Sequence, residues 1–270
     1  MQTHRYLPEA NRVSVLMAAI LLAFALTRVL SAPNLKIALP LAGIMLAFSV
    51  NLNTVIVVLA AGITATGMDW LLRTHPLIEQ GESREHWLLP TLTVLVTGVS
   101  LYTLPGGTSW WLGFGLAGVV LVVVFLAEYV VVDPADTRYP AATAILTALA
   151  FAIFLILAVA LRAANTRLFL ILPALFLASG LAALRTLHLR LNESWELNWA
   201  IGIALVETQL AAALHYFPLT PVRFGLVLLG PVYALTLLAV SLSDGNPFRR
   251  ASVEPLVMLM ILWGLAVWFH

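Results

Sequence analysis

The strongest constraint on this chain is a series of long, continuous apolar runs. A helix needs about 20 mostly apolar residues to cross a bilayer, and ten runs approach or exceed that length. Their apolar residues are consecutive instead of alternating, which indicates a helical bundle and not a β-barrel. The runs are residues 13–31, 35–52, 54–72, 87–104, 109–132, 141–161, 168–189, 199–217, 221–242 and 253–269. We therefore predict an all-α, polytopic integral membrane bundle of about ten transmembrane helices, forming a single transmembrane domain over residues 1–270.

The composition excludes several classes of protein. Hydrophobic residues make up 61% of the chain and charged residues only 10%, whereas soluble domains carry roughly 25% charged residues. The 14 basic and 13 acidic residues nearly cancel, so no strong field would recruit nucleic acid. No cysteine is present, which removes disulfides and thiolate metal sites. We expect a lipid bilayer around the protein, no metal and no other cofactor, with membrane-protein partners or a second copy left open.

The second run, residues 35–52, is the least certain span. It is short and continues into Asn51-Leu52-Asn53, so a re-entrant segment is the alternative to a spanning helix.

Orientation follows from the lysines and arginines near the ends of the spans. Nine of the 14 fall on one side and five on the other, whether or not residues 35–52 cross. We expect the protein in the cell membrane, and the side with nine of these residues should face the cytoplasm. It holds loops 73–86, 133–140, 190–198 and 243–252. Only the side of the N-terminus depends on residues 35–52.

Two stretches of the chain resemble each other. Residues 28–40 and 162–173 each begin with an arginine, contain an asparagine and a second basic residue, and reach a proline early in the next apolar run. Their offset is about half the chain. This favours two inverted halves, residues 1–135 and 136–270, as in many secondary transporters, although apolar helices also match by chance.

The most informative constellation surrounds a carboxylate inside an apolar run. At 100° per residue, Glu207 shares one helix face with Ala200, Ala204 and Ala211. Small residues allow a neighbouring helix to approach closely. Gln209 flanks Glu207, and His215 lies further along the same side. Two interpretations remain: a carboxylate in a substrate or proton path, or a buried group that holds the bundle in register.

Arg185 and Asp69 also extend small-residue faces. Arg185 follows alanines spaced four residues apart in its run, and we expect it to pair with Glu207 or Asp69 inside the bundle. Asp69 follows Ala61, Gly62, Ala65 and Thr66 on one side of its run. Its alternative is a local pair with Arg73, because i, i+4 charges meet on a helix.

Four further residues lie near the expected cytoplasmic ends: His75, Glu128, Asp133 and Asp136. Their candidate role is a shared metal or phosphate site, since acidic pairs hold Mg²⁺ on diphosphates. No second acidic motif accompanies Asp133 and Asp136, and no two histidines have the spacing of a helical metal site.

Three functions fit these observations, and none is tied to a recognised motif. The first is a small secondary carrier whose path includes Glu207, Gln209 and His215, with Arg185 as counter-charge. The second is a non-catalytic subunit of a larger membrane complex. The third is a lipid-modifying enzyme that uses Asp69 together with the four cytoplasmic-end residues. Loop-poor helical proteins of this size favour the carrier first and the enzyme last, so we expect no catalytic residues.

Overall fold

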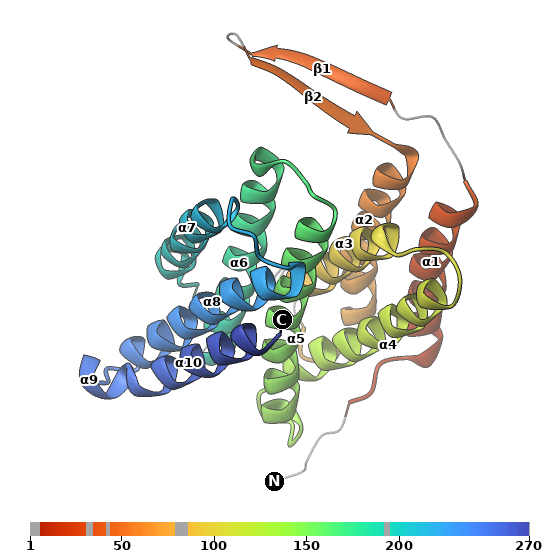
Figure 1. The fold of residues 1–270 in the computed structure, drawn as a ribbon. Coiled ribbons are helices and arrows are strands. Elements are labelled where there is room, and N and C mark those ends of the chain that lie inside the picture. Colours follow the sequence, from red (N-terminus) through yellow and green to blue (C-terminus); the bar gives the residue numbers. More distant parts are fainter. Residues whose placement is uncertain (1–5, 31–34, 42–43, 79–85, 192–194, 270) are drawn as a thin grey trace. The chain divides into compact units, whose positions relative to one another are not determined.

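The computed structural model describes residues 6–30, 35–41, 44–78, 86–191 and 195–269, and it is dominated by helices. The chain divides into two compact units, Tyr6–Tyr129 and Val130 onward. The first unit contains α1 (Ala10–Val29), β1 (Leu35–Leu41), β2 (Ile44–Val50), α2 (Leu52–Leu72), α3 (Leu88–Thr103) and nearly all of α4 (Thr108–Val131). The second contains α5 (Tyr139–Ala163), α6 (Leu168–Arg190), α7 (Leu197–Leu214), α8 (Pro221–Ser243), α9 (Phe248–Ala251) and α10 (Val253–Trp268) (Figure 1).

In the described part, eight helical stretches are long and apolar enough to cross a membrane, with α9 and α10 counted together. The ninth, α3, has 16 residues, or about 24 Å of helix. The protein is therefore a multi-pass helical membrane protein, as predicted, but with eight or nine spans instead of about ten.

Residues 35–52 are the source of this difference, and the prediction of a spanning helix there is wrong. β1 and β2 pair antiparallel, with Leu35 opposite Val50 and Leu41 opposite Ile44. Asn51 caps α2 by accepting a hydrogen bond from the Thr54 amide at 2.8 Å. Two paired strands, and not a helix, therefore precede the cap of α2. Pro40 also lacks the N–H that an interior helical position donates.

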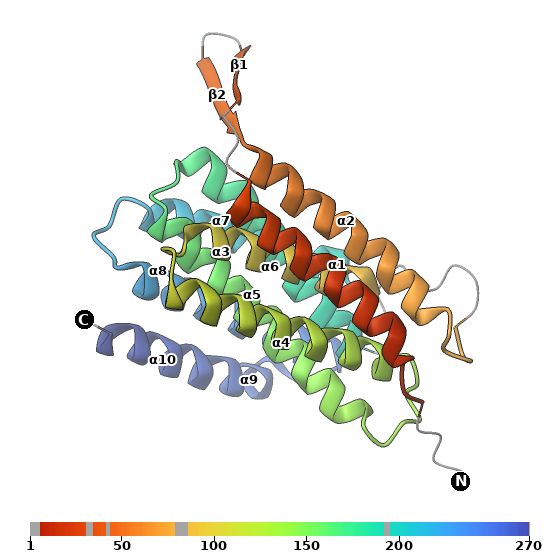
Figure 2. The ribbon, with the colours of Figure 1, turned by 90° about the vertical axis from the view of Figure 1, so that its right-hand side faces the viewer.

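In the first unit, α2 packs between α1 and α3, and the hairpin extends beyond the neighbouring ends of α1 and α2 (Figure 2). The buried face of α2 consists of Val57, Ala60, Ala61, Thr64, Met68, Leu71 and Leu72. Gly62 and Thr66 are exposed. The small-residue face predicted for α2 therefore differs from the face that packs. A helix that is apolar on all sides has little hydrophobic periodicity from which to predict its buried face.

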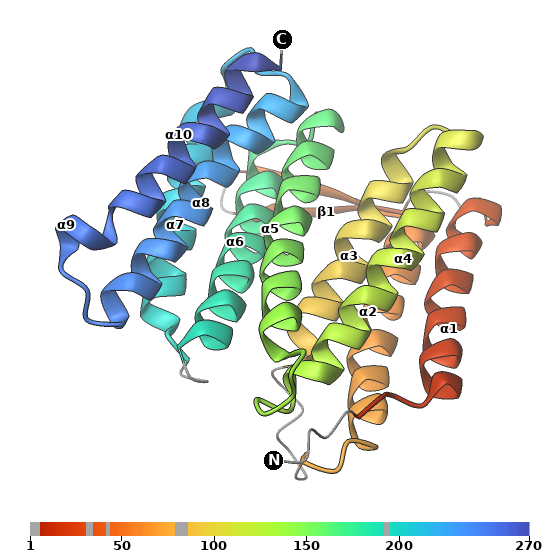
Figure 3. The ribbon, with the colours of Figure 1, turned by 90° about the horizontal axis from the view of Figure 1, so that it is seen from below.

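In the second unit, α5, α6, α7 and α8 pack side by side, and α10 lies along α8 (Figure 3). Glycines permit two of the close contacts. An added Cβ at Gly225 of α8 would lie 2.7 Å from Val159 of α5. One at Gly230 would lie 2.9 Å from Leu259 and 3.0 Å from the Trp263 indole nitrogen on α10. These helices therefore depend on small residues to approach each other, as membrane helices commonly do.

In the candidate repeat, residues 162–173 continue into α6, whereas residues 28–40 continue into the β1–β2 hairpin. The two similar sequences therefore do not share secondary structure, and an inverted repeat remains a prediction from the sequence.

Candidate functional site

The inward face of α7 carries a fully buried carboxyl group. Its buried residues are Ala200, Ile203, Ala204, Glu207 and Ala211, which include every member of the face predicted from the sequence. Glu207 is 0% exposed. In the described part of the chain, neither of its carboxylate oxygens has a hydrogen-bond partner.

The helix opposite this face is α6. A Cβ built on Gly180 would lie 3.4 Å from the Cβ of Ala204, so the two backbones approach closely one turn before Glu207. Ala178 and Ala182 of α6 are also buried. Small side chains therefore line this contact on both helices. At a buried position such as that of Glu207, an ionised, unpaired carboxylate is costly.

Among the described residues no hydrogen bond joins Arg185 to Glu207, since neither carboxylate oxygen has such a partner there. The predicted pairing of Arg185 with Glu207 or Asp69 stays a prediction. The two helices run antiparallel and meet near Gly180 and Ala204. Arg185 lies five residues after Gly180 on α6, and Glu207 lies three residues after Ala204 on α7. Because the helices are antiparallel, these steps lead in opposite directions and separate the two backbone positions by about 12 Å along the helix axes. Arg185 is itself buried, at 1% exposure.

Gln209 does not lie beside the carboxyl group. It is exposed, because two residues turn an α-helix by about 200° and place the side chain on the opposite face. The expectation that Gln209 lines a path with Glu207 is therefore not supported by its position.

His215 follows the last residue of α7 and keeps helical dihedral angles. It lines a small pocket of about 110 Å³ together with Leu161, Arg162, Asn165, Thr166 and Ile171. Its Nδ1 atom is buried and makes no hydrogen bond within the described residues. Because His215 lies eight residues after Glu207, this pocket is about 12 Å from the carboxyl group along the helix.

Arg162 builds the other side of this pocket from the last turn of α5. Its Nη1 donates to the backbone oxygen of His215 and its Nη2 to that of Phe217, both at 2.7 Å. The guanidinium carbon lies 5.3 Å from the centre of the Phe224 ring. One arginine thus fixes the end of α7 against α5. From the sequence, Arg162 is marked only as the first residue of the 162–173 stretch at the end of an apolar run, and nothing there predicts its contact with α7.

Asp69 forms the local pair that was the alternative to a buried role. Its Oδ2 lies 2.7 Å from Nη2 of Arg73, whose side chain is 72% exposed. An exposed pair of this kind contributes about 0–1 kcal/mol and indicates no site.

His75 and Glu128 are both buried, but in separate interactions of the first unit. His75 makes edge contacts with the rings of Tyr6 and Tyr129, at centroid distances of 5.2 and 4.9 Å. Oε2 of Glu128 forms a hydrogen bond with Nδ1 of His86 at 2.8 Å. The sequence did not predict the bond between His86 and Glu128, which are 42 residues apart.

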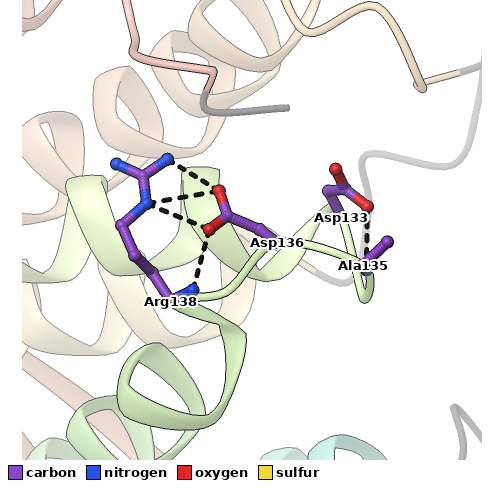
Figure 4. Close-up of polar contacts among 4 residues, drawn as sticks. All are labelled: Asp133, Ala135, Asp136 and Arg138. Atoms are coloured by element: carbon purple, nitrogen blue, oxygen red, sulfur yellow. Dashed lines mark hydrogen bonds and ion pairs between the residues drawn. The ribbon is translucent and has the colours of Figure 1, made fainter. Parts of the chain in front are cut away.

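Asp133 and Asp136 form two consecutive turns before α5 (Figure 4). Asp133 Oδ1 accepts from the Ala135 amide at 2.9 Å, and Asp136 Oδ1 accepts from the Arg138 amide at 2.8 Å. Asp136 also pairs with the Arg138 guanidinium at 2.7 Å, and this hydrogen bond raises the pKa of Arg138 above its ordinary value. The two carboxylates therefore shape the loop. Among the described residues, no cluster of three or more His, Asp or Glu side chains could hold a metal ion.

Comparison with known proteins places the chain in one family. Residues 31–269 match the model of DUF5656, a family described as proteins of unknown function. Because the match covers most of the chain, the protein belongs to this family. No curated protein and no solved structure matches it.

Proposed function

We propose that this DUF5656 protein is a small secondary carrier in which Glu207 takes up a proton or a small cation. The observation that carries the proposal is a fully buried carboxyl group with no hydrogen-bond partner in the described structure. Ionisable groups at membrane depth are costly, and they mark substrate or ion paths by default. A group that only held the bundle in register would be expected to have its bonds satisfied.

A row of side chains gives the proposed path a direction. Glu207, Ala211 and His215 are spaced four residues apart, so they follow one side of α7 with a drift of about 40° per step. The row begins near the middle of the helix and ends at the pocket that His215 and Arg162 line. We assign this pocket as the entrance and Glu207 as the site where the charge is taken up.

The hairpin at residues 35–50 favours one orientation. Without a crossing there, we propose that the N-terminus faces the cytoplasm, together with the loops after α2, α4, α6 and α8. Nine arginines then lie near the cytoplasmic ends, whereas four arginines and Lys36 lie near the others. The pocket at the end of α7 would open on the outer side of the cell membrane.

The test uses the absence of native cysteine. Ala211→Cys and Ala204→Cys are made separately with Glu207 intact, and cells are treated with a small, membrane-impermeant thiol reagent. If water follows the row from the pocket, Ala211→Cys reacts readily and Ala204→Cys reacts more slowly. Gln209→Cys is the matched control on the exposed face of the same helix, which contacts lipid in the proposed arrangement and should stay unlabelled.

Arg73→Cys supplies the second control. Its side chain is 72% exposed and lies on the proposed cytoplasmic side, so it should react only after the membrane is opened. If Ala211→Cys and Ala204→Cys remain unlabelled in open membranes while Arg73→Cys reacts, the face is a dry contact. The carrier is then refuted and the non-catalytic subunit becomes the better account.

A further inference from the structure

We propose that the pocket between α5 and the end of α7 binds a small monovalent anion, of the class of chloride or a short carboxylate. This deepens the proposed function, on which it rests in one respect: the anion would be the substrate that travels with the proton or cation at Glu207. A proton and a monovalent anion together carry no net charge, which lowers the cost of crossing a medium of low dielectric constant.

The charge of the pocket is the first reason. Among the described residues, Arg162 donates hydrogen bonds to the neutral carbonyl groups of His215 and Phe217. Within the described chain no carboxylate pairs with it, so its positive charge is uncompensated by any acid. A guanidinium has five N–H donors, and these two bonds leave further donors to bind an anion.

The polar lining is the second reason. His215 contributes a ring nitrogen, Nδ1, that makes no hydrogen bond in the described structure, while Asn165 and Thr166 border the same volume. Three elements thus supply these groups: the last turn of α5, the loop before α6 and the end of α7. Such convergence of a few polar groups in a concave, partly apolar site is typical of small-ligand pockets.

The backbone of the loop is built to place Asn165 here. Asn165 has a φ of +48°, in the left-handed region that asparagine tolerates better than most residues. The Thr166 amide donates to the Leu161 oxygen at 3.3 Å, and the Asn165 amide to the Arg162 oxygen at 3.2 Å. These bonds end α5 with a tight turn, which turns the chain back beside Arg162.

The size of the pocket limits the ligand. Its volume is about 110 Å³, roughly three to four times the 30 Å³ that one water occupies in the liquid. An ion of one to four heavy atoms matches this volume better than a sugar acid or a nucleotide does.

The experiment measures anion binding to the purified full-length protein in detergent. Thermal unfolding is followed by tryptophan fluorescence while sodium chloride or sodium acetate replaces sodium gluconate at constant ionic strength. A ligand that binds the folded state raises the unfolding temperature saturably with its concentration. We expect saturable stabilisation by at least one of the two anions. Acetate alone would identify a carboxylate site, and both together a general monovalent-anion site.

Asn165 offers matched variants that keep the backbone. Glycine and aspartate both tolerate a positive φ, so Asn165→Gly and Asn165→Asp should fold. The first removes the amide and should leave most binding. The second places a negative charge in the pocket and should weaken binding by at least about tenfold. Asn246→Asp, in the turn between α8 and α9, makes the same charge change elsewhere and should bind as the unmodified protein does.

The inference is overturned if neither anion stabilises the protein saturably, or if Asn165→Asp binds as tightly as Asn165→Gly. Failure of the carrier proposal is a separate result. If anions still bind while Ala211→Cys remains unlabelled, the anion site is supported and the proposed path from the pocket to Glu207 is refuted. Glu207→Gln should keep the binding, because the carboxyl group lies about 12 Å away along the helix.

Discussion

Replacing Glu207 with leucine should make the protein more stable. The carboxyl group is 0% exposed and neither oxygen makes a hydrogen bond to the described residues, so the folded state bears the cost of desolvating it. Leucine has a similar length, carries no polar atom and suits a face otherwise composed of alanine and isoleucine. A stability gain from removing a polar group is expected where that group serves function and not folding.

The expected gain in stability is the cost of the unsatisfied carboxyl group minus the cost of the new side-chain shape. A buried polar group left without a partner costs about 1–3 kcal/mol, and the changed side-chain shape should return at most about 1.5 kcal/mol of that. Taking the middle of both ranges, the net gain is about 1 kcal/mol. For a chain of this size each kcal/mol corresponds to roughly 2–4 °C in unfolding temperature.

The assay is thermal unfolding of the purified protein in one detergent, compared with Gln209→Leu. Gln209 is exposed on the same helix, so its variant reports the effect of added apolar surface without the buried site. Glu207→Gln should change stability little, because its amide brings two unsatisfied groups of its own. A fall of the unfolding temperature in Glu207→Leu, with Gln209→Leu unchanged, would show that Glu207 stabilises the fold and would refute the reasoning.

Two further predictions concern packing and pairing, and both use unfolding measurements. His86→Ala should cost about 1–3 kcal/mol, because it removes the 2.8 Å hydrogen bond to the buried Glu128. Arg73→Ala removes an exposed pair and should cost less than about 1 kcal/mol. Equal losses would contradict the difference in burial. Gly230→Val should cost about 1–3 kcal/mol by overpacking α8 against α10, while Gly62→Val, with no atom within 4 Å of an added Cβ, should stay within about 0.5 kcal/mol; a destabilised Gly62→Val would contradict the open surroundings.

The sequence predicted the packing face of α7 well because its small residues and its charge follow one helical period. Ala200, Ala204, Glu207 and Ala211 are all buried. The same reasoning predicted the wrong packing face for α2, because this helix is apolar on all sides and its hydrophobic periodicity is weak. It also failed for residues 35–52, since a short apolar run with an internal proline fits a strand as well as a helix.

Contacts between distant residues could not be predicted in the same way. Arg162 reaches the backbone of His215 and Phe217 across more than 50 residues, and nothing local marks that partner. His86 and Glu128 are likewise joined only by the fold. The pairing of Arg185 with Glu207 or Asp69 stays a prediction, because it depends on a register between helices that no sequence period specifies.

Infrared difference spectroscopy of Glu207 tests the central claim most directly. The C=O stretching band of a protonated carboxyl group is assigned by comparing the unmodified protein with Glu207→Gln, and its shift is then followed after transfer to D₂O. The carrier account predicts a band that disappears in Glu207→Gln and shifts rapidly in D₂O, because water reaches the carboxyl group through the pocket at His215. A Glu207-dependent band that resists exchange for hours in the folded protein, or the absence of any such band, would contradict it.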